Sequence, residues 1–265
     1  MFASWREMRE RSNRYGLEIN SYDWLKFAAL VIMTIDHVGA YLIMDGPEWW
    51  KAVGRVTFPV WFFLAGYSQS RKLGGEIIWL GLLLQVICAA TYHGVFPLNA
   101  LFSIIICRYI IFFCKDRGWI EKYPFEIFTA CLILSPFTTP FFEYGTLGVA
   151  FAAMGDMVRR GYTGRKYQAF FVLSTFLYLG WQHMWFNFDM WQSLVVWAGT
   201  GYTVWILASF EVRETHLLKP ESTMASTVRF ISRNTMHYYF YHRAAFQIAA
   251  VLLGIKTFEH FILFN

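Results

Sequence analysis

The sequence predicts an all-α fold, a polytopic integral membrane helix bundle with about nine transmembrane helices (range 8–10). Three observations lead to this prediction. Hydrophobic residues make up 57% of the 265 residues and charged residues only 15%, whereas ordinary soluble domains carry about 25% charged residues. Apolar runs close to membrane length alternate along the chain with short charged loops. In addition, every second loop is rich in Lys and Arg.

The apolar runs define nine predicted spans, in chain order 24–44, 54–70, 75–95, 98–114, 125–141, 145–158, 167–186, 190–210 and 230–254. Several approach the ~20 residues that an α-helix needs to cross a hydrocarbon core of about 30 Å. The runs 54–70 and 145–158 are shorter, and we expect them to tilt or to be partly re-entrant. Gly66, in the first of these two, allows a close approach of another helix. The chain thus divides into a cytoplasmic basic N-terminal segment, 1–21, and a single transmembrane helical domain, 22–256.

The placement of Lys and Arg predicts the orientation of the bundle. Basic residues precede the first span and follow the second, fourth, sixth and eighth spans, whereas the intervening loops hold mainly Lys51 and Arg55. The positive-inside rule then puts the N-terminus in the cytoplasm and, with nine spans, the C-terminus outside. Residues 1–20 lack an apolar core, so we expect no cleavable signal peptide. The segment 2–16 is either a basic helix on the inner leaflet or a solvated tail that sets topology.

Charge and cysteine usage exclude two kinds of site. The net charge of +5 is dispersed between apolar spans and forms no dense patch, so we expect no nucleic-acid partner. The four cysteines lie in or at the ends of apolar segments and match no zinc pattern: Cys88, Cys107, Cys114 and Cys131. We interpret them as small buried hydrophobic residues and expect neither a metal nor disulfides.

The first span holds an acid and an imidazole side by side, Asp36 and His37. A carboxylate in hydrocarbon costs about 2.5–3.5 kcal/mol on insertion scales, so this pair indicates a functional polar site. At 1.5 Å per residue, His37 lies about 20 Å along a helix that begins near Trp24, in the outer half of the membrane. Adjacent helical side chains point about 100° apart, so Asp36 need not orient His37 and is free to pair with an Arg of another helix. The alternative, that both are satisfied packing residues, stays open.

Three arginines in or beside apolar runs are candidate binding residues. Arg55, near the outer end of the second span, is expected to pair with Asp36 or to polarise a substrate carbonyl; interfacial snorkelling is the alternative. Arg71 and Arg108 lie near the inner ends of the second and fourth spans. Because Arg forms bidentate contacts with phosphate, both are candidates to hold the phosphates of a nucleotide cofactor, unless they only set topology.

The last span carries a concentration of polar residues. Asn234, Tyr238 and Tyr241 share a helix face at i, i+4 and i+7 spacing, and His242 continues it at i+8. We interpret this face as the lining of a cavity. Arg243, deep in the same run, needs a carboxylate partner, and the candidates are Asp36, Glu143 and Asp156.

Residues 25–39, LKFAALVIMTIDHVG, resemble the opening helix of the TraX family, integral membrane proteins linked to N-terminal acetylation of conjugative pilin. The second span, from GRVTFP at 54–59 to GYS at 66–68, is similar to the same family. SRNT at 232–235, leading to Tyr241 and His242, resembles the closing helix of a wider transmembrane acyltransferase group. That group includes the acyltransferase-3 proteins and the lysosomal heparan N-acetyltransferase. The Arg after His242 departs from its pattern, which has an uncharged residue there.

The resemblance implies acetyl-CoA as the donor substrate, entering from the cytoplasm. It also implies a membrane-embedded histidine, which maps to His37, and it maps Arg55 to the Arg before the Phe-Pro pair. We therefore assign the catalytic roles to His37, Asp36 and Arg55, with His37 as the general base. The candidate residues for binding acetyl-CoA are Arg71, Arg108, Tyr67, Asn234, Tyr238, Tyr241 and His242.

The predicted function is an acetyltransferase of the bacterial inner membrane that acts on an amine or hydroxyl at the outer side, on a pilin-like N-terminus or a surface glycan. No Ser or Cys lies in a nucleophile motif, which favours direct transfer over a covalent acyl-enzyme. Intramembrane Asp, His and Arg also build proton relays, so a proton-coupled membrane transporter is one alternative. A non-catalytic membrane assembly factor is the other. The expected partners are membrane lipid, acetyl-CoA and the acceptor peptide or glycan, and a homo-oligomer is left open.

Overall fold

The computed structural model describes residues 7, 8, 10, 16–43, 49–68, 75–91 and 94–255. Within them α-helices make up nearly all of the regular structure: α2 (Ser21–Leu42), α3 (Trp49–Arg55), α4 (Phe58–Tyr67), α5 (Gly75–Ala90), α6 (Ala100–Asp116), α7 (Trp119–Lys122), α8 (Pro124–Thr138), α9 (Leu147–Arg159), α10 (Arg165–Trp185), α11 (Met190–Ala208), α12 (Thr223–Arg233) and α13 (Thr235–Leu252). A short antiparallel sheet pairs β1 (Ile19–Asn20) with β2 (Glu214–Thr215). The all-α prediction is confirmed, and each of the nine predicted spans contains a helix.

One helix among the described residues, α2, is long and apolar enough to cross a membrane. α5 and α8 are also apolar but have only 16 and 15 residues. The count of nine transmembrane helices therefore stays a prediction. Large apolar side chains are nevertheless exposed along four helices, α5, α8, α10 and α11, among them Trp79, Val86, Ile133, Phe137, Phe176 and Trp205.

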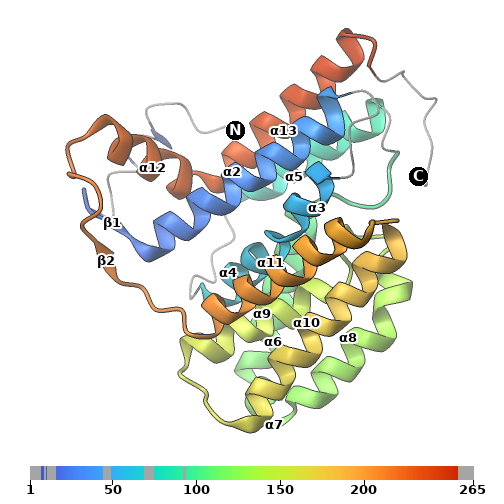
Figure 1. The fold of residues 1–265 in the computed structure, drawn as a ribbon, viewed down its shortest axis with the longest axis vertical. Helices are drawn as coiled ribbons and strands as arrows, with labels where there is room; N and C mark the ends of the chain where they lie inside the picture. The colour runs from blue at the N-terminus through green and yellow to red at the C-terminus, as the bar shows by residue number, and fades with distance from the viewer. Residues whose placement is uncertain are drawn as a thin grey trace.

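The helices form two groups (Figure 1). α2, α5, α12 and α13 lie together in the upper part of the view and form what we call the α2–α13 group. α4, α6, α8, α9, α10 and α11 fill the lower part and form the α4–α9 group. Each group has its own apolar core, around Leu30, Leu84 and Phe240 in the first and around Phe63, Phe151 and Phe170 in the second. The two cavities described below lie between the groups and are lined by residues of both.

The start of α2 is fixed by residues from the far end of the sequence. Asn20 caps the helix, because its side chain accepts a hydrogen bond from the backbone N–H of Asp23. The buried Asp23 carboxylate pairs with Arg233 of α12 at 3.0 Å. Trp24 donates its indole N–H to the Thr215 hydroxyl at 3.0 Å, next to the β1–β2 pairing. These contacts orient α2, and with it the residues that α2 carries toward the cavities.

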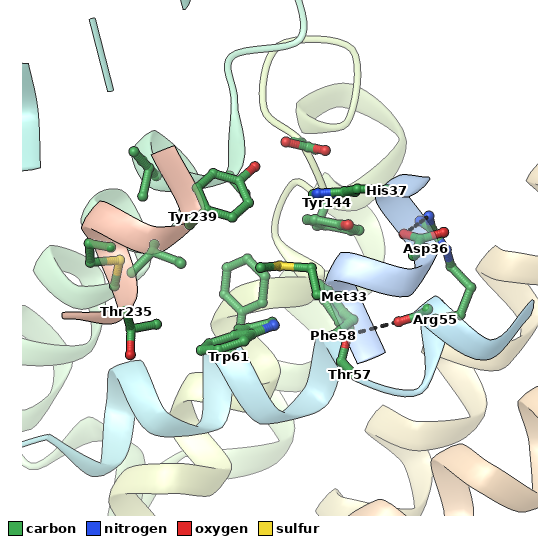
Figure 2. Close-up of a pocket in the computed structure, with 17 residues that line it drawn as sticks. Met33, Asp36, His37, Arg55, Thr57, Phe58, Trp61, Tyr144, Thr235 and Tyr239 are labelled. Atoms are coloured by element: carbon green, nitrogen blue, oxygen red, sulfur yellow. Dashed lines mark hydrogen bonds and ion pairs between the residues drawn. The ribbon is translucent and has the colours of Figure 1, made fainter. Parts of the chain in front are cut away.

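The predicted span 54–70 is broken into two helices. α3 ends at Arg55, and α4 begins at Phe58 with Pro59 in its first turn, a position where the missing N–H of proline costs no hydrogen bond. Hydropathy continues across the break, which is why the sequence predicts a single helix. Figure 2 shows the result: Arg55, Thr57 and Phe58 lie on the wall of a cavity.

The predicted span 230–254 is also broken. Asn234 leaves helical geometry, with φ −115° and ψ 32°, so α12 ends at Arg233 and α13 begins at Thr235. The Asn234 side chain donates to the backbone carbonyl of Phe230 at 2.9 Å and so caps the end of α12. The helix that carries Tyr238, Tyr241 and His242 thus starts after Asn234, not before it.

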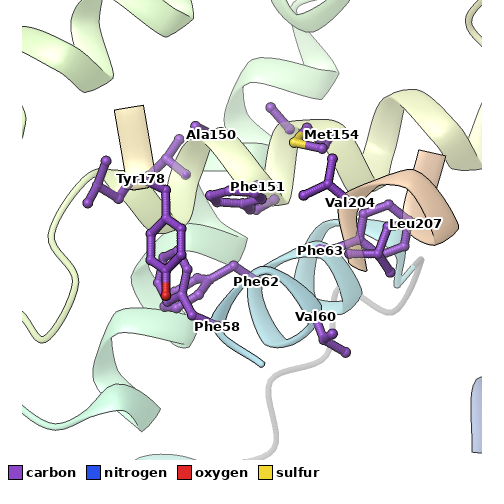
Figure 3. Packing of buried hydrophobic residues seen from close by; sticks show 14 of the residues in the cluster. Phe58, Val60, Phe62, Phe63, Ala150, Phe151, Met154, Tyr178, Val204 and Leu207 are labelled. Atoms are coloured by element: carbon purple, nitrogen blue, oxygen red, sulfur yellow. The ribbon is translucent and has the colours of Figure 1, made fainter. Parts of the chain in front are cut away.

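α4 and α9 cross with their backbones in contact at the centre of the α4–α9 group. A Cβ atom on Gly66 would overlap the carbonyl oxygen of Ala152, and one on Gly155 would overlap that of Phe63. The expected close approach at Gly66 is therefore confirmed. Aromatic rings fill the space around the crossing (Figure 3), where Phe58 stacks on Tyr178 at 4.5 Å between ring centroids.

Candidate active site

A cavity lies between the two helix groups, bounded by α2 and α13 on one side and by the α3–α4 turn and α6 on the other (Figure 2). Its volume is about 50 Å³, enough for a few water molecules. The predicted catalytic residues Asp36, His37 and Arg55 all line it. Other walls come from Met33, Phe58, Trp61, Glu143, Tyr144 and Tyr239. We call this cavity the histidine pocket.

His37 meets His242 of α13 across the boundary between the two helices. The Nδ1 atom of His37 lies 2.7 Å from Nε2 of His242, and Nδ1 of His242 lies 2.7 Å from the backbone carbonyl oxygen of Tyr238. The Tyr238 hydroxyl lies 3.3 Å from the Thr34 hydroxyl, one turn before His37. The sequence assigns Tyr238 and His242 to cofactor binding. In the structure His242 contacts the predicted catalytic histidine, and Tyr238 contacts His242.

Asp36 pairs with Arg55 and not with His37. The Asp36 Oδ2 atom accepts a hydrogen bond from Arg55 Nη2 at 3.2 Å, and both side chains are largely buried. The pair fits because residue 54 is glycine: a Cβ atom there would overlap the Asp36 carboxylate. The Tyr178 hydroxyl donates to the backbone carbonyl of Arg55 at 2.6 Å and so fixes the end of α3. This pairing between helices is the one expected from the 100° separation of Asp36 and His37.

Asp36 and Arg55 each keep hydrogen-bonding capacity in this pair. Neither Asp36 Oδ1 nor Arg55 Nε, both buried, has a hydrogen-bond partner within the described part of the chain. Buried polar atoms without a partner are rare in folded proteins and call for a ligand or an ordered water. The Arg55 side chain therefore retains a donor for a molecule in the histidine pocket.

The connection between α8 and α9 supplies two residues of the pocket that the sequence did not predict as site residues. Glu143 accepts a hydrogen bond from Arg243 of α13 at 2.9 Å, so of the three candidate partners for Arg243 the structure selects Glu143. Tyr144 has a φ of 73°, a conformation that residues other than glycine rarely adopt. Burial raises the pKa of Tyr144 to about 12, so its phenol stays protonated at neutral pH. Nothing in the local sequence pattern marks Tyr144.

A second cavity, of about 330 Å³, lies toward the start of α2. Three cationic side chains line it, Lys26 from α2, Arg108 from α6 and Arg233 from α12, and neutral polar residues such as Asn234 lie beside them. His237, which also lines this cavity, pairs with Glu76 of α5 at 2.8 Å, and Arg233 pairs with Asp23 at 3.0 Å. We call this cavity the basic pocket. Its composition suits a phosphate-bearing ligand, because Lys and Arg bind phosphate oxygens through charge-assisted hydrogen bonds.

The two pockets share a wall. Trp61 of α4, Ile104 of α6, and Thr235 and Met236 of α13 line both of them. The Trp61 indole N–H is buried and has no hydrogen-bond partner among the described residues. A ligand long enough to reach across this wall would therefore touch both His37 and Arg108.

Of the other residues predicted to bind the cofactor, some line the basic pocket and others line neither cavity. Arg108 and Asn234 line the basic pocket. Tyr67 packs in an aromatic cluster with Phe63 and Phe210 and lines neither cavity, and Tyr241 is 42% exposed on the other side of α13. Arg71 lies outside the residues that the structure describes.

The structure offers no metal-binding cluster within the described ranges, since no group of three or more His, Cys, Asp or Glu side chains converges there. The four cysteines are buried and unbonded to one another. The polar groups that line the histidine pocket are therefore imidazole, carboxylate, guanidinium and phenol side chains, together with the hydroxyls of Thr57 and Thr235 and the Trp61 indole.

A family model described as TraX protein matches residues 21–254, which include every residue of both pockets and His242. The chain belongs to the TraX family. TraX proteins are membrane proteins. Uncharacterized protein RP591 of Rickettsia prowazekii (strain Madrid E) is 30% identical over 161 residues, which make up 59% of this chain and 63% of that protein. The chain thus matches less than two thirds of the length of this relative. No solved structure matches the chain at a significant level.

Proposed function

We propose that this TraX protein is a polytopic integral membrane acetyltransferase. It moves an acetyl group from cytoplasmic acetyl-CoA to an amine or hydroxyl on the outer side of the bacterial inner membrane, on a pilin-like N-terminus or a surface glycan. One observation carries the proposal: a pocket that holds a histidine and a pocket lined by cations share a wall between the same helices. A donor whose phosphates and reactive thioester lie at opposite ends of a long arm needs this arrangement.

The exposed apolar surface supports a membrane setting for the whole bundle. Trp79, Phe137 and Trp205, on three different helices, are each more than 60% exposed. Large exposed apolar patches require a cover of lipid or protein. Lys26 and His37 lie eleven residues apart on α2, about 16 Å along the helix axis, so the two pockets lie at different depths. With the N-terminus in the cytoplasm, the basic pocket faces the cytoplasm and the histidine pocket faces outward.

In the proposed mechanism, Lys26 and Arg108, together with Arg71, hold the donor phosphates. His37 takes a proton from the acceptor amine or hydroxyl while that atom attacks the thioester carbonyl. Arg55 donates to the oxygen that gains negative charge, an interaction worth about 3–4 kcal/mol in other acyl transfers. The new C–N or C–O bond then forms fully as the C–S bond breaks, and the coenzyme A thiolate takes up the proton from His37. No protein nucleophile is needed, so the acetyl group transfers directly.

The replacement His37→Ala tests the proposal. We expect coenzyme A release from acetyl-CoA, measured with purified protein in nanodiscs and a peptide or glycan acceptor, to fall about 10²–10⁴-fold because the general base is lost. His183→Ala is the matched control, since His183 is exposed in the last turn of α10. The proposal is wrong if the wild-type protein neither binds nor cleaves acetyl-CoA with any acceptor of these two classes. Proton-dependent solute uptake into vesicles would instead favour a transporter.

A further inference from the structure

The His242 ring is hydrogen-bonded at both of its nitrogens. Nδ1 lies 2.7 Å from the Tyr238 carbonyl oxygen, and Nε2 lies 2.7 Å from Nδ1 of His37. The two imidazole planes differ by only 17°, and their centroids are 4.9 Å apart. This separation is close to the N–N distance plus the two ring radii, so the rings meet edge to edge, nearly in one plane. In this geometry the ring lone pair of one histidine points at the N–H of the other.

The backbone carbonyl decides where the protons are. A carbonyl oxygen only accepts, so Nδ1 of His242 must carry a proton. A neutral imidazole has one N–H, which leaves Nε2 of His242 as the acceptor. Nδ1 of His37 must then be the donor in the bond between the two rings, and the lone pair of His37 lies on Nε2.

We infer that His242 is a positioning residue that holds His37 in its Nδ1–H tautomer and makes Nε2 the basic nitrogen. This inference deepens the proposed function and rests on it for the role of His37 as base. In a Ser-His-Asp triad a carboxylate does this work. Here the neighbouring carboxylate, Asp36, is paired with Arg55 instead, and a second neutral imidazole takes its place.

The packing around His242 fits this role. The Tyr238 ring stacks on it at 5.2 Å between centroids, and Tyr239 and Phe246 meet it edge-on at 5.7 Å. The ring is thus held from several sides. The chain of hydrogen bonds also ends at a peptide carbonyl, which does not take up a proton. A proton accepted by His37 is therefore not passed on along α13.

Nitrogen-15 NMR of histidine-labelled protein in nanodiscs tests the inference without any turnover. His37 is one of seven histidines, and its signals are assigned by their absence in His37→Gln. We expect His37 to carry its proton on Nδ1 in the wild type and to lose this preference in His242→Ala. An Nε2–H tautomer of His37 in the wild type, or a doubly protonated His242 that donates to His37, would overturn the inference.

Enzyme kinetics provide a second test of the positioning role of His242. We expect His242→Leu to lower kcat about 10²-fold with little change in KM, because the base is mis-oriented while the pockets stay intact. His242→Gln should recover much of the loss, since its amide oxygen accepts from His37 Nδ1–H. Equal losses in the Leu and Gln variants would contradict a positioning role. The control is His216→Gln, an exposed residue after β2. If NMR shows the expected tautomer but the protein never turns over acetyl-CoA, the proposed function is wrong and the inference about the histidine pair still holds.

Discussion

Two helix pairs hold this protein together in opposite ways. α4 and α9 meet through Gly66 and Gly155, whose missing side chains let the backbones touch. α2 and α13 meet through side chains, both apolar ones such as Leu30 and Phe240 and the hydrogen-bonded pair of His37 and His242. Both are known routes to helix association where lipid removes the hydrophobic drive. The α4–α9 contact should therefore be broken by added atoms, whereas the α2–α13 contact should lose its hydrogen bonds when side-chain atoms are removed.

The largest expected effect comes from adding one methyl group to the α4–α9 crossing. Gly155→Ala would put a Cβ into the Phe63 carbonyl, and backbone atoms cannot move aside as side chains do. We expect a loss of more than about 4 kcal/mol of stability, beyond the usual cost of overpacking. Thermal unfolding in nanodiscs measures it.

The matched control for this prediction is Gly180→Ala on α10, where a new Cβ meets nothing within 4 Å. Alanine is the better helix former by about 1 kcal/mol, so this variant should be neutral or slightly stabilised. Similar melting temperatures for the two variants would show that α4 and α9 are not in backbone contact.

A smaller effect is expected from breaking the Asp36–Arg55 pair beside the histidines. Arg55→Met leaves a buried carboxylate without its partner and should cost about 3 kcal/mol of stability. Adding Asp36→Asn should restore most of that stability but no acetyl transfer, which separates folding from chemistry at this site. Chemical or thermal unfolding of the single and double variants provides the measurement.

The control for that experiment is the surface ion pair between Arg213 and Glu211, whose side chains are 75% and 68% exposed. Arg213→Met should cost less than about 1 kcal/mol, as surface ion pairs do. If the double variant stays as unstable as Arg55→Met, the Asp36–Arg55 pair is not the interaction that was lost.

The smallest expected effect lies in the basic pocket, where one cation is replaced. Arg108→Gln should raise the Kd and KM for acetyl-CoA about tenfold and leave kcat unchanged, since one charged hydrogen bond contributes about 1.5 kcal/mol or more. Isothermal titration and initial rates measure this. Arg117→Gln, an exposed cation just after α6, is the control. A fall in kcat with constant KM would place Arg108 in the chemistry and not in donor binding.

The sequence predicted the helices well because the apolar runs report them directly. Each run contains a helix, and the Asp36–Arg55 pair follows from the need to match a buried charge. The breaks before Phe58 and at Asn234 were not predicted, because hydropathy does not register a change of backbone direction. Helical spacing placed Tyr241 on the same face as His242, but the structure exposes it. Neighbouring residues on a helix point about 100° apart, so a face assigned from spacing alone includes side chains that point away from the cavity.

The contact between His37 and His242 was beyond sequence reasoning for another reason. Periodicity describes one helix at a time, and only the three-dimensional arrangement brings together two rings that are 205 positions apart. Tyr144 was missed for a similar reason, because its place in the pocket depends on a turn with a positive φ and not on a pattern of residue types.

The long sequence separation within the histidine pair has a consequence for biosynthesis. α2 leaves the ribosome early, but its partners Thr215, Arg233 and His242 are made some 200 residues later. Throughout translation of the intervening helices, α2 therefore lacks these contacts with the C-terminal part of the chain. Only after synthesis has passed residue 242 can the His37 ring be held by His242.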